Sequence, residues 1–140
     1  MNNIKQIIDS FDGFVQQHPI LQTFTWGRLS DTGRNNEPLN FPLLHAIPLP
    51  STVNETYTDF TFNIIIADLL DDQELNQLDV IEEAYEILQD FITYYINGLS
   101  NETFFVNPPI TFTPFLDRFT KVMAGVEAQI TLRVEGSYCL

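Results

Sequence analysis

Residues 71–98, DDQELNQLDVIEEAYEILQDFITYYING, decide the fold because they predict one long amphipathic helix. Asp71 and Glu74 stand at the spacing of a capping box, and Asn97-Gly98 is typical of a left-handed C-terminal cap. Between these ends, apolar side chains recur at the spacing of one helical face: Leu78, Ile81, Tyr85, Leu88, Ile92 and Tyr95. We expect this face to pack on the rest of the chain.

The opposite face of the predicted helix is acidic. No Lys or Arg stands at the three- or four-residue spacing that would neutralise its carboxylates. Two interpretations stay open: a solvated face, or a surface that meets a basic partner or repels nucleic acid. The acidic face consists of Asp79, Glu82, Glu83, Glu86 and Asp90.

A further apolar flank lies between these two faces, where three residues recur at a spacing of seven and Phe91 borders them. This flank indicates either a broad core face under a neighbouring loop or a contact with another subunit. Candidate residues for a subunit contact are Val80, Ile87, Phe91, Tyr94, Arg118 and Arg133.

Alternating patterns before and after the long helix predict strands. In residues 56–67 every second residue from Phe60 to Ile66 is apolar, and residues 126–135 alternate in the same way. Gly125 predicts a bulge or bend before the last strand. Strands are also expected over 21–29 and 43–49, and an edge strand or irregular segment over 103–115, where Pro interrupts the pattern.

An N-terminal helix over residues 3–17 completes the predicted elements, because apolar residues again follow helical spacing. Consecutive strands with short connections imply antiparallel pairing, and both helices are expected on the apolar sheet face. The sequence therefore predicts an α+β fold: a two-layer sandwich with a mainly antiparallel sheet of about 4–6 strands. Residues 1–140 are expected to form a single domain, with flexible loops at about 30–42 and 99–111.

The formal charge of −13 is spread unevenly, since no Lys or Arg occurs between Arg34 and Arg118. A chain of this kind lacks the cations that bind a phosphate backbone, so sequence-specific nucleic-acid binding is not expected. No apolar run approaches the roughly 20 residues of a membrane span, and no secretory pattern opens the chain. The single cysteine, Cys139, excludes an internal disulfide.

Catalytic residues, a metal site and a cofactor are not predicted. The two histidines, His18 and His45, have no motif context and indicate a helix cap and a hydrogen-bonded strand residue. No nucleophile elbow, P-loop or dinucleotide-binding motif occurs. The acidic cluster around Asp71 lacks the spacing of a calcium loop and indicates helix capping instead.

Residues 113–135 carry a family resemblance. The segments Thr113-Pro114-Phe115, Asp117-Arg118-Phe119 and Ala124-Gly125, followed by the last alternating strand, resemble small virion proteins of tailed phages that infect Bacteroidetes, including the crAss-like group. Residues 57–68 and 78–96 fit the same pattern as a long strand followed by a long helix. Those relatives are tail-terminator or neck-ring subunits.

The resemblance implies a non-enzymatic virion protein, made in the host cytoplasm, whose α+β subunits form a ring around a DNA passage. Its partners would be further copies of itself, six in a terminator or often twelve in a neck, and the portal, neck or tail proteins. Basic ends of one subunit could meet the acidic middle of the next. The competing interpretation is a small acidic binding or adaptor module with a groove between the sheet and the long helix.

Overall fold

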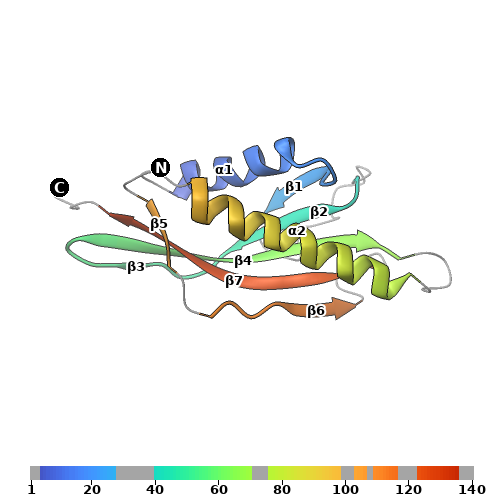
Figure 1. Ribbon diagram of the computed structural model, residues 1–140. Coiled ribbons are helices and arrows are strands. Elements are labelled where there is room, and N and C mark those ends of the chain that lie inside the picture. The colour runs from blue at the N-terminus through green and yellow to red at the C-terminus, as the bar shows by residue number, and fades with distance from the viewer. Residues whose placement is uncertain are drawn as a thin grey trace.

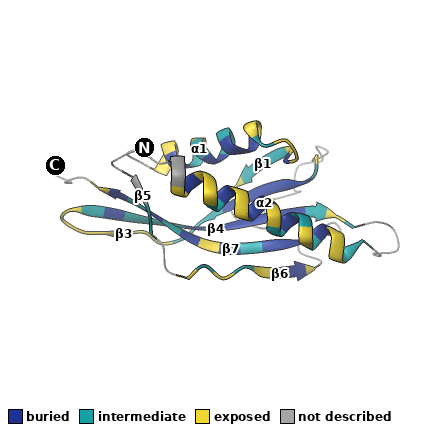
Figure 2. Ribbon diagram, in the orientation of Figure 1, coloured by how far each residue is buried: buried dark blue, intermediate teal, exposed yellow. Residues whose placement is uncertain are grey.

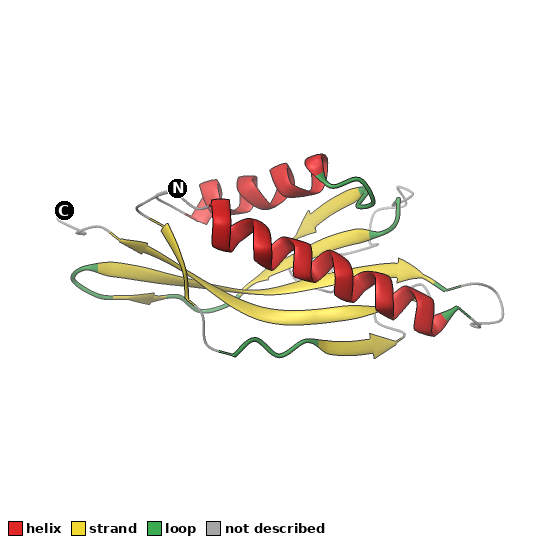
Figure 3. Cartoon of the chain, in the orientation of Figure 1, coloured by secondary structure: helices red, strands yellow, loops and turns green. Residues whose placement is uncertain are grey.

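A computed structural model describes residues 4–27, 40–70, 76–98, 103–106, 109–116 and 123–135. Within these ranges the fold is α+β, with two helices and a mixed sheet of seven strands (Figure 1, Figure 3). The elements are α1 (Ile4–Gln17), β1 (Thr23–Trp26), β2 (Leu43–Pro48), β3 (Thr52–Val53), β4 (Tyr57–Leu69), α2 (Gln77–Gly98), β5 (Thr103–Val106), β6 (Thr113–Leu116) and β7 (Met123–Glu135).

The sheet is built on β4 and β7, which pair antiparallel along their whole length, from Tyr57 opposite Glu135 to Leu69 opposite Met123. Strands β2 and β3 share the other edge of β4, and β5 and β6 share the other edge of β7. Strand β1 lies outside β2 and runs parallel to it. The sheet is therefore larger than the 4–6 strands expected, and it is mixed where β1 joins it.

The core lies between the two helices and one face of the sheet, and Figure 2 colours its buried residues dark blue along both helices and the central strands. Alternate residues of β4 and β7 supply the sheet side of this core, as the period of two predicted. They are Phe62, Ile64, Ile66, Val126, Ala128, Ile130, Leu132 and Val134. A smaller apolar cluster on the opposite face contains Leu43, Ile65, Ala67, Phe115 and Met123.

Helix α2 begins at Gln77, later than the start predicted at Asp71, and residues 71–75 lie outside the described part of the chain. The Val80 amide donates to the Asn76 carbonyl at 3.0 Å, which is the first helical hydrogen bond of this element. The end at Gly98 agrees with the predicted C-terminus.

The buried face of α2 contains the predicted face and extends beyond it. Leu88 and Tyr95 are buried and Ile81, Tyr85 and Ile92 pack against the core as predicted, whereas Leu78 is 75% exposed. Val80, Ile87 and Phe91 are buried as well, so the further apolar flank is part of a broad core face. The cause is α1, which packs beside α2: the ring centroids of Phe11 and Phe91 lie 5.4 Å apart. Three of the residues proposed for a subunit contact therefore lie in the core of this chain, and only Tyr94 on that flank is exposed, at 39%.

Two polar contacts join α1 to α2. The His18 amide caps α1 by donating to the Phe14 carbonyl at 2.9 Å, and its ring Nε2 lies 2.9 Å from a carboxylate oxygen of Asp90. His18 Nδ1 accepts from the amides of Ile20 and Leu21, so Nε2 carries the proton that is donated to Asp90. His18 follows the last residue of α1 as predicted, but its ring bonds to Asp90 and to the amides of Ile20 and Leu21, not to the last carbonyls of the helix.

The second contact is a hydrogen bond between Tyr95 and Ser10, with 2.6 Å between their oxygens. Ser10 Oγ also lies 2.6 Å from the Ile7 carbonyl, to which it donates, so the Tyr95 hydroxyl donates to Ser10. Burial raises the pKa of Tyr95 well above its usual range, which keeps this donor protonated.

Tyr95→Phe is expected to lower the free energy of unfolding by about 1 kcal/mol, because a buried hydrogen bond is lost while the ring packing remains. Urea denaturation followed by circular dichroism measures this change. Tyr94→Phe is the matched control, since Tyr94 is a partly exposed neighbour, and its change should stay below about 0.5 kcal/mol. Equal effects of the two substitutions would contradict the assigned bond.

Two further differences concern the second half of the chain. Strand β5 lies within the segment 99–111 for which a loop was predicted, although it also falls in the segment 103–115 for which an edge strand or irregular segment was expected, and β6 forms an edge strand there. No bulge occurs at Gly125, because β7 keeps an unbroken register with β4 from Met123 to Glu135. The segment 28–39, which holds most of the other predicted loop, lies outside the described residues.

Candidate functional site

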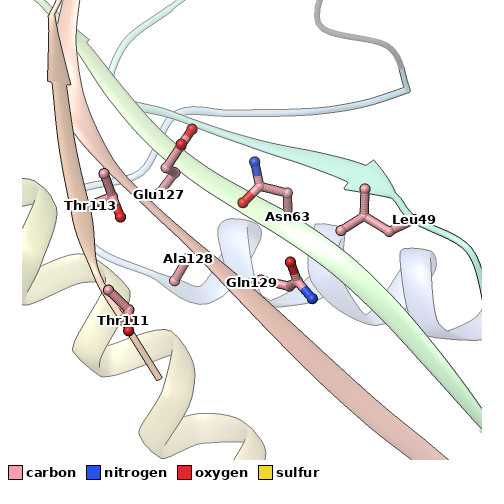
Figure 4. Close-up of a pocket in the computed structure, with 7 residues that line it drawn as sticks. All are labelled: Leu49, Asn63, Thr111, Thr113, Glu127, Ala128 and Gln129. Atoms are coloured by element: carbon pink, nitrogen blue, oxygen red, sulfur yellow. The ribbon is translucent and has the colours of Figure 1, made fainter. Parts of the chain in front are cut away.

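A cavity of about 430 Å³ opens on the sheet face opposite the helices (Figure 4). This volume falls in the range of small-molecule sites, roughly 300–1,000 Å³. Three strands and the segment leading into β6 supply its walls. The lining residues are Leu49, Asn63, Thr111, Thr113, Glu127, Ala128 and Gln129.

The cavity exists because β6 separates from β7. Thr113 pairs with Glu127, and the same register would place Thr111 opposite Gln129, but the pairing ends at Thr113. Pairing with β7 begins again at β5, where Val106 stands opposite Thr131, and the register of β5 differs by three residues from that of β6. A second cavity of about 220 Å³ adjoins the separated segment, and Thr111 and Gln129 line both.

Main-chain groups of Gln129 also face this gap. The Leu49 amide donates to the Thr61 carbonyl at 2.8 Å, so odd-numbered residues of β4 bond toward β2 and even-numbered ones toward β7. In an antiparallel pair, residues that stand opposite each other exchange their main-chain hydrogen bonds, and even residues of β4 stand opposite even residues of β7. The even residues of β7 therefore bond to β4, and the N–H and C=O groups of its odd residues point toward the β5–β6 edge. Among the described strands, none pairs with Gln129 on that side.

The lining combines amides, hydroxyls and one carboxylate, that of Glu127, so it favours a ligand that forms hydrogen bonds. Asn63 and Gln129 stand opposite each other across β4 and β7, and Thr111 and Thr113 lie on the β6 side of β7 (Figure 4). None of the lining residues is a Lys or Arg, so a phosphate group finds no cation here. None is a Cys, Ser or His; the lining hydroxyls belong to Thr111 and Thr113, and Glu127, the strand partner of Thr113, supplies the one lining carboxylate.

His45 lies on β2, where its side chain is buried and hydrogen-bonded. Its Nδ1 lies 2.7 Å from the Thr25 hydroxyl and its Nε2 lies 3.1 Å from the Gly27 carbonyl. Because a carbonyl only accepts, Nε2 donates to Gly27 and Nδ1 accepts from Thr25. The prediction of a hydrogen-bonded strand histidine is confirmed.

The chain matches no family model and no curated protein. Within the described ranges, acidic and histidine side chains form no cluster able to hold a metal ion. No described helix is long and apolar enough to cross a membrane. Burial raises the pKa of Asp68, but this residue stands near the end of β4, away from the cavity.

The predicted acidic face lies on the outer side of α2, so the helix layer separates it from the cavity (Figure 2). Asp79, Glu82, Glu86 and Asp90 are exposed, and Glu83 is partly buried. Of these five, Asp90 makes the described contact with His18. The face is thus a surface feature of the helix rather than part of a pocket.

The Arg133 side chain makes its contacts with residues of the same chain. Its guanidinium donates to both carboxylate oxygens of Asp59, at 2.8 and 3.0 Å, and its central carbon lies 3.7 Å from the centroid of the Tyr57 ring. The Asp59 carboxylate raises the pKa of Arg133. Arg133 lies on the open sheet face, away from the acidic face, and Arg118 lies outside the described residues.

The cavity itself is the feature that sequence reasoning missed. Its one sequence signal is the pair Pro108-Pro109 ahead of an alternating segment, which indicated an irregular edge strand. That signal does not reveal where the strand leaves its neighbour, because the register depends on β7, which follows later in the chain.

Proposed function

We propose that this chain is a non-enzymatic virion structural protein, one subunit of a homo-oligomeric ring at the head–tail junction or tail end of a phage. The subunit is a two-layer α+β unit, with helices outside and a sheet open at its edges. The observation that carries the proposal is the outer surface of α2, where five carboxylates share one helix face and none of the described Lys or Arg residues pairs with them.

A surface of this kind suits a ring through which DNA passes. Carboxylates repel the phosphate backbone, so DNA slides past them without being held. The same carboxylates attract cations of a neighbouring subunit, and the basic residues of this chain lie toward its two ends. Both roles follow from one acidic surface on the outside of the helix layer.

The direct test is the size of the purified protein in solution. Light scattering over a range of concentrations and negative-stain images should show closed rings with six or twelve copies. A chain that remains monomeric at every concentration would contradict the proposal. Adding the portal, neck or tail proteins encoded by neighbouring genes should promote ring formation.

The acidic face provides a sharper prediction. Changing Glu82, Glu83 and Glu86 together to Gln is expected to weaken ring assembly about tenfold and to reduce its salt dependence, because exposed ion pairs contribute up to about 1 kcal/mol each. Light scattering at low and high salt measures both effects. An unchanged ring with an unchanged salt response would rule out a role of this face in subunit contacts.

A matched control removes the same charge elsewhere. Asp9→Asn, Glu55→Gln and Glu135→Gln together change the net charge by the same amount at three exposed positions outside α2. This variant should assemble like the parent. If both triple variants weaken assembly equally, the effect belongs to net charge and not to the α2 surface.

A second candidate function is a small acidic binding or adaptor module, which the open-face cavity favours. Its site would lie on the open sheet face, because buried side chains fill the space between the sheet and α2. A thermal-shift screen of neutral sugars and short peptides tests this function. A shift that Gln129→Ala removes would support it over the ring.

A further inference from the structure

Strand β1 is an edge strand without the usual protection. Among the described strands, β2 pairs with one side of β1 and none pairs with the other. Natural edge strands are protected from other chains by charged residues, by proline or by bulges. Thr23–Trp26 contains no charged residue and no proline, so its free edge offers a site for another strand.

The main-chain groups of β1 are oriented for such pairing. The Gly27 amide donates to the Ala46 carbonyl at 2.9 Å, so within β1 the alternate residues Thr23 and Thr25 bond toward β2. Ahead of the strand the Gln22 amide donates to the Pro42 carbonyl at 2.9 Å, so this alternation begins only at Thr23. Phe24 and Trp26 are the intervening residues, and their N–H and C=O groups point away from β2. The free edge thus presents two residues with hydrogen-bonding groups directed outward.

Trp26 adds a large apolar surface at this edge. It is the single tryptophan of the chain, and 59% of it is exposed, although tryptophan is on average highly buried in folded proteins. Tryptophan is enriched among the residues that dominate binding energy at protein interfaces. An exposed tryptophan beside an unprotected strand edge therefore marks an interaction surface.

The opposite edge of the same sheet is also uncharged. On β6 the outward main-chain groups belong to Pro114, which has a carbonyl but no N–H, and to Leu116, which has both. Residues 103–116, which include β5 and β6, contain no Asp, Glu, Lys or Arg, and neither do residues 19–27 around β1. Leu116 on β6 is 46% exposed. In a chain with a formal charge of −13, these two edges are places where copies can approach without repulsion.

We propose that the β1 edge, with Trp26, binds the β5–β6 edge of a second copy of this chain. The contact joins different surfaces of the two copies, so its repetition produces a ring when the rotation closes. A second copy is favoured over an acidic or nucleic-acid partner because it supplies a matching uncharged edge. The inference rests on the proposed ring function and names the surfaces that build it.

Fluorescence of the single tryptophan provides the test. As concentration rises, the emission maximum of Trp26 should shift to the blue, and the midpoint of this shift should coincide with the increase in mass seen by light scattering. Leu116→Asp, which puts a charge on the receiving edge, should abolish both changes. Trp26→Ala should weaken association at least tenfold.

Leu78→Ala is the matched control, because Leu78 is the more exposed side chain and lies on α2, away from both edges. It should associate like the parent, and melting curves should show that Trp26→Ala remains folded. Rings that form with unchanged Trp26 emission and tolerate Trp26→Ala would overturn this inference and leave the proposed function standing. A parent chain that never associates would overturn both.

Discussion

Gly125→Ala is expected to destabilise the fold by about 3 kcal/mol or more, a large part of the stability of a small domain. Gly125 is buried in β7 opposite Ala67. A Cβ atom placed there would overlap the carbonyl oxygen of Ile66 and lie 2.9 Å from the carbonyl carbon. These are main-chain atoms of β4, so no side chain can rotate away to make room.

Urea denaturation measures this loss as a lower midpoint at an unchanged slope. Gly13→Ala is the control, because a Cβ there meets no atom within 4 Å. Gly13 lies inside α1, where alanine is favoured over glycine by about 0.5–1 kcal/mol, so this variant should gain stability. The same chemical change is expected to act in opposite directions at the two sites. A Gly125→Ala protein as stable as the parent would contradict the close approach of β7 to β4.

The role of Gly125 shows where a sequence pattern stops being informative. The alternation after it correctly predicts which side chains of β7 face the core, because the period of two depends on that strand alone. A glycine in such a pattern indicates a bulge or a close main-chain approach. The choice between them depends on β4, whose register with β7 is not encoded locally.

Helix α2 shows a similar limit. Its residues contain two adjacent apolar stripes, and the pattern of one helix cannot rank them. The sheet covers one stripe and α1 covers part of the other, so both are largely buried, and Leu78, at the start of the helix, is exposed. The burial of Phe91 depends on α1, some sixty residues earlier in the chain.

The site was less predictable than the fold. The acidic face of α2 follows from helical spacing alone, and four of its five residues are exposed as expected. The cavity depends on Thr111 separating from Gln129, and the free edge of β1 depends on β1 standing at the end of the strand order beside β2. Both are relations between distant segments, so neither is visible in a local pattern.

The two proposed surfaces lie on different sides of the subunit. The uncharged edges lie at the two sides of the sheet, whereas the acidic face lies on the helix layer above it (Figure 1). Copies joined edge to edge would continue the sheet from one subunit to the next and place every α2 on the same side of the ring. Acidic helices would then line one wall of the assembly, which agrees with a passage for DNA.

This arrangement requires the helices to be packed tightly on the sheet, and Phe11 makes the central packing contact between them. Its side chain is fully buried at the point where α1, α2 and β4 meet. Its ring centroid lies 5.0 Å from that of Phe62, 5.4 Å from Phe91 and 5.6 Å from Tyr95. The contacts with Phe62 and Tyr95 are edge-to-face, the geometry that favours aromatic pairs.

Phe11→Ala is therefore expected to lower the free energy of unfolding by about 3–5 kcal/mol, since it removes a large buried ring and leaves a cavity bordered by three others. Chemical denaturation followed by circular dichroism measures the loss. Gln17→Ala, at an exposed position near the end of the same helix, should change stability by less than about 0.5 kcal/mol. Phe11→Leu keeps much of the volume and should fall between them. A Phe11→Ala protein that loses no more stability than Gln17→Ala would show that α1 does not pack at this junction, and the proposed orientation of the acidic helix layer would lose its support.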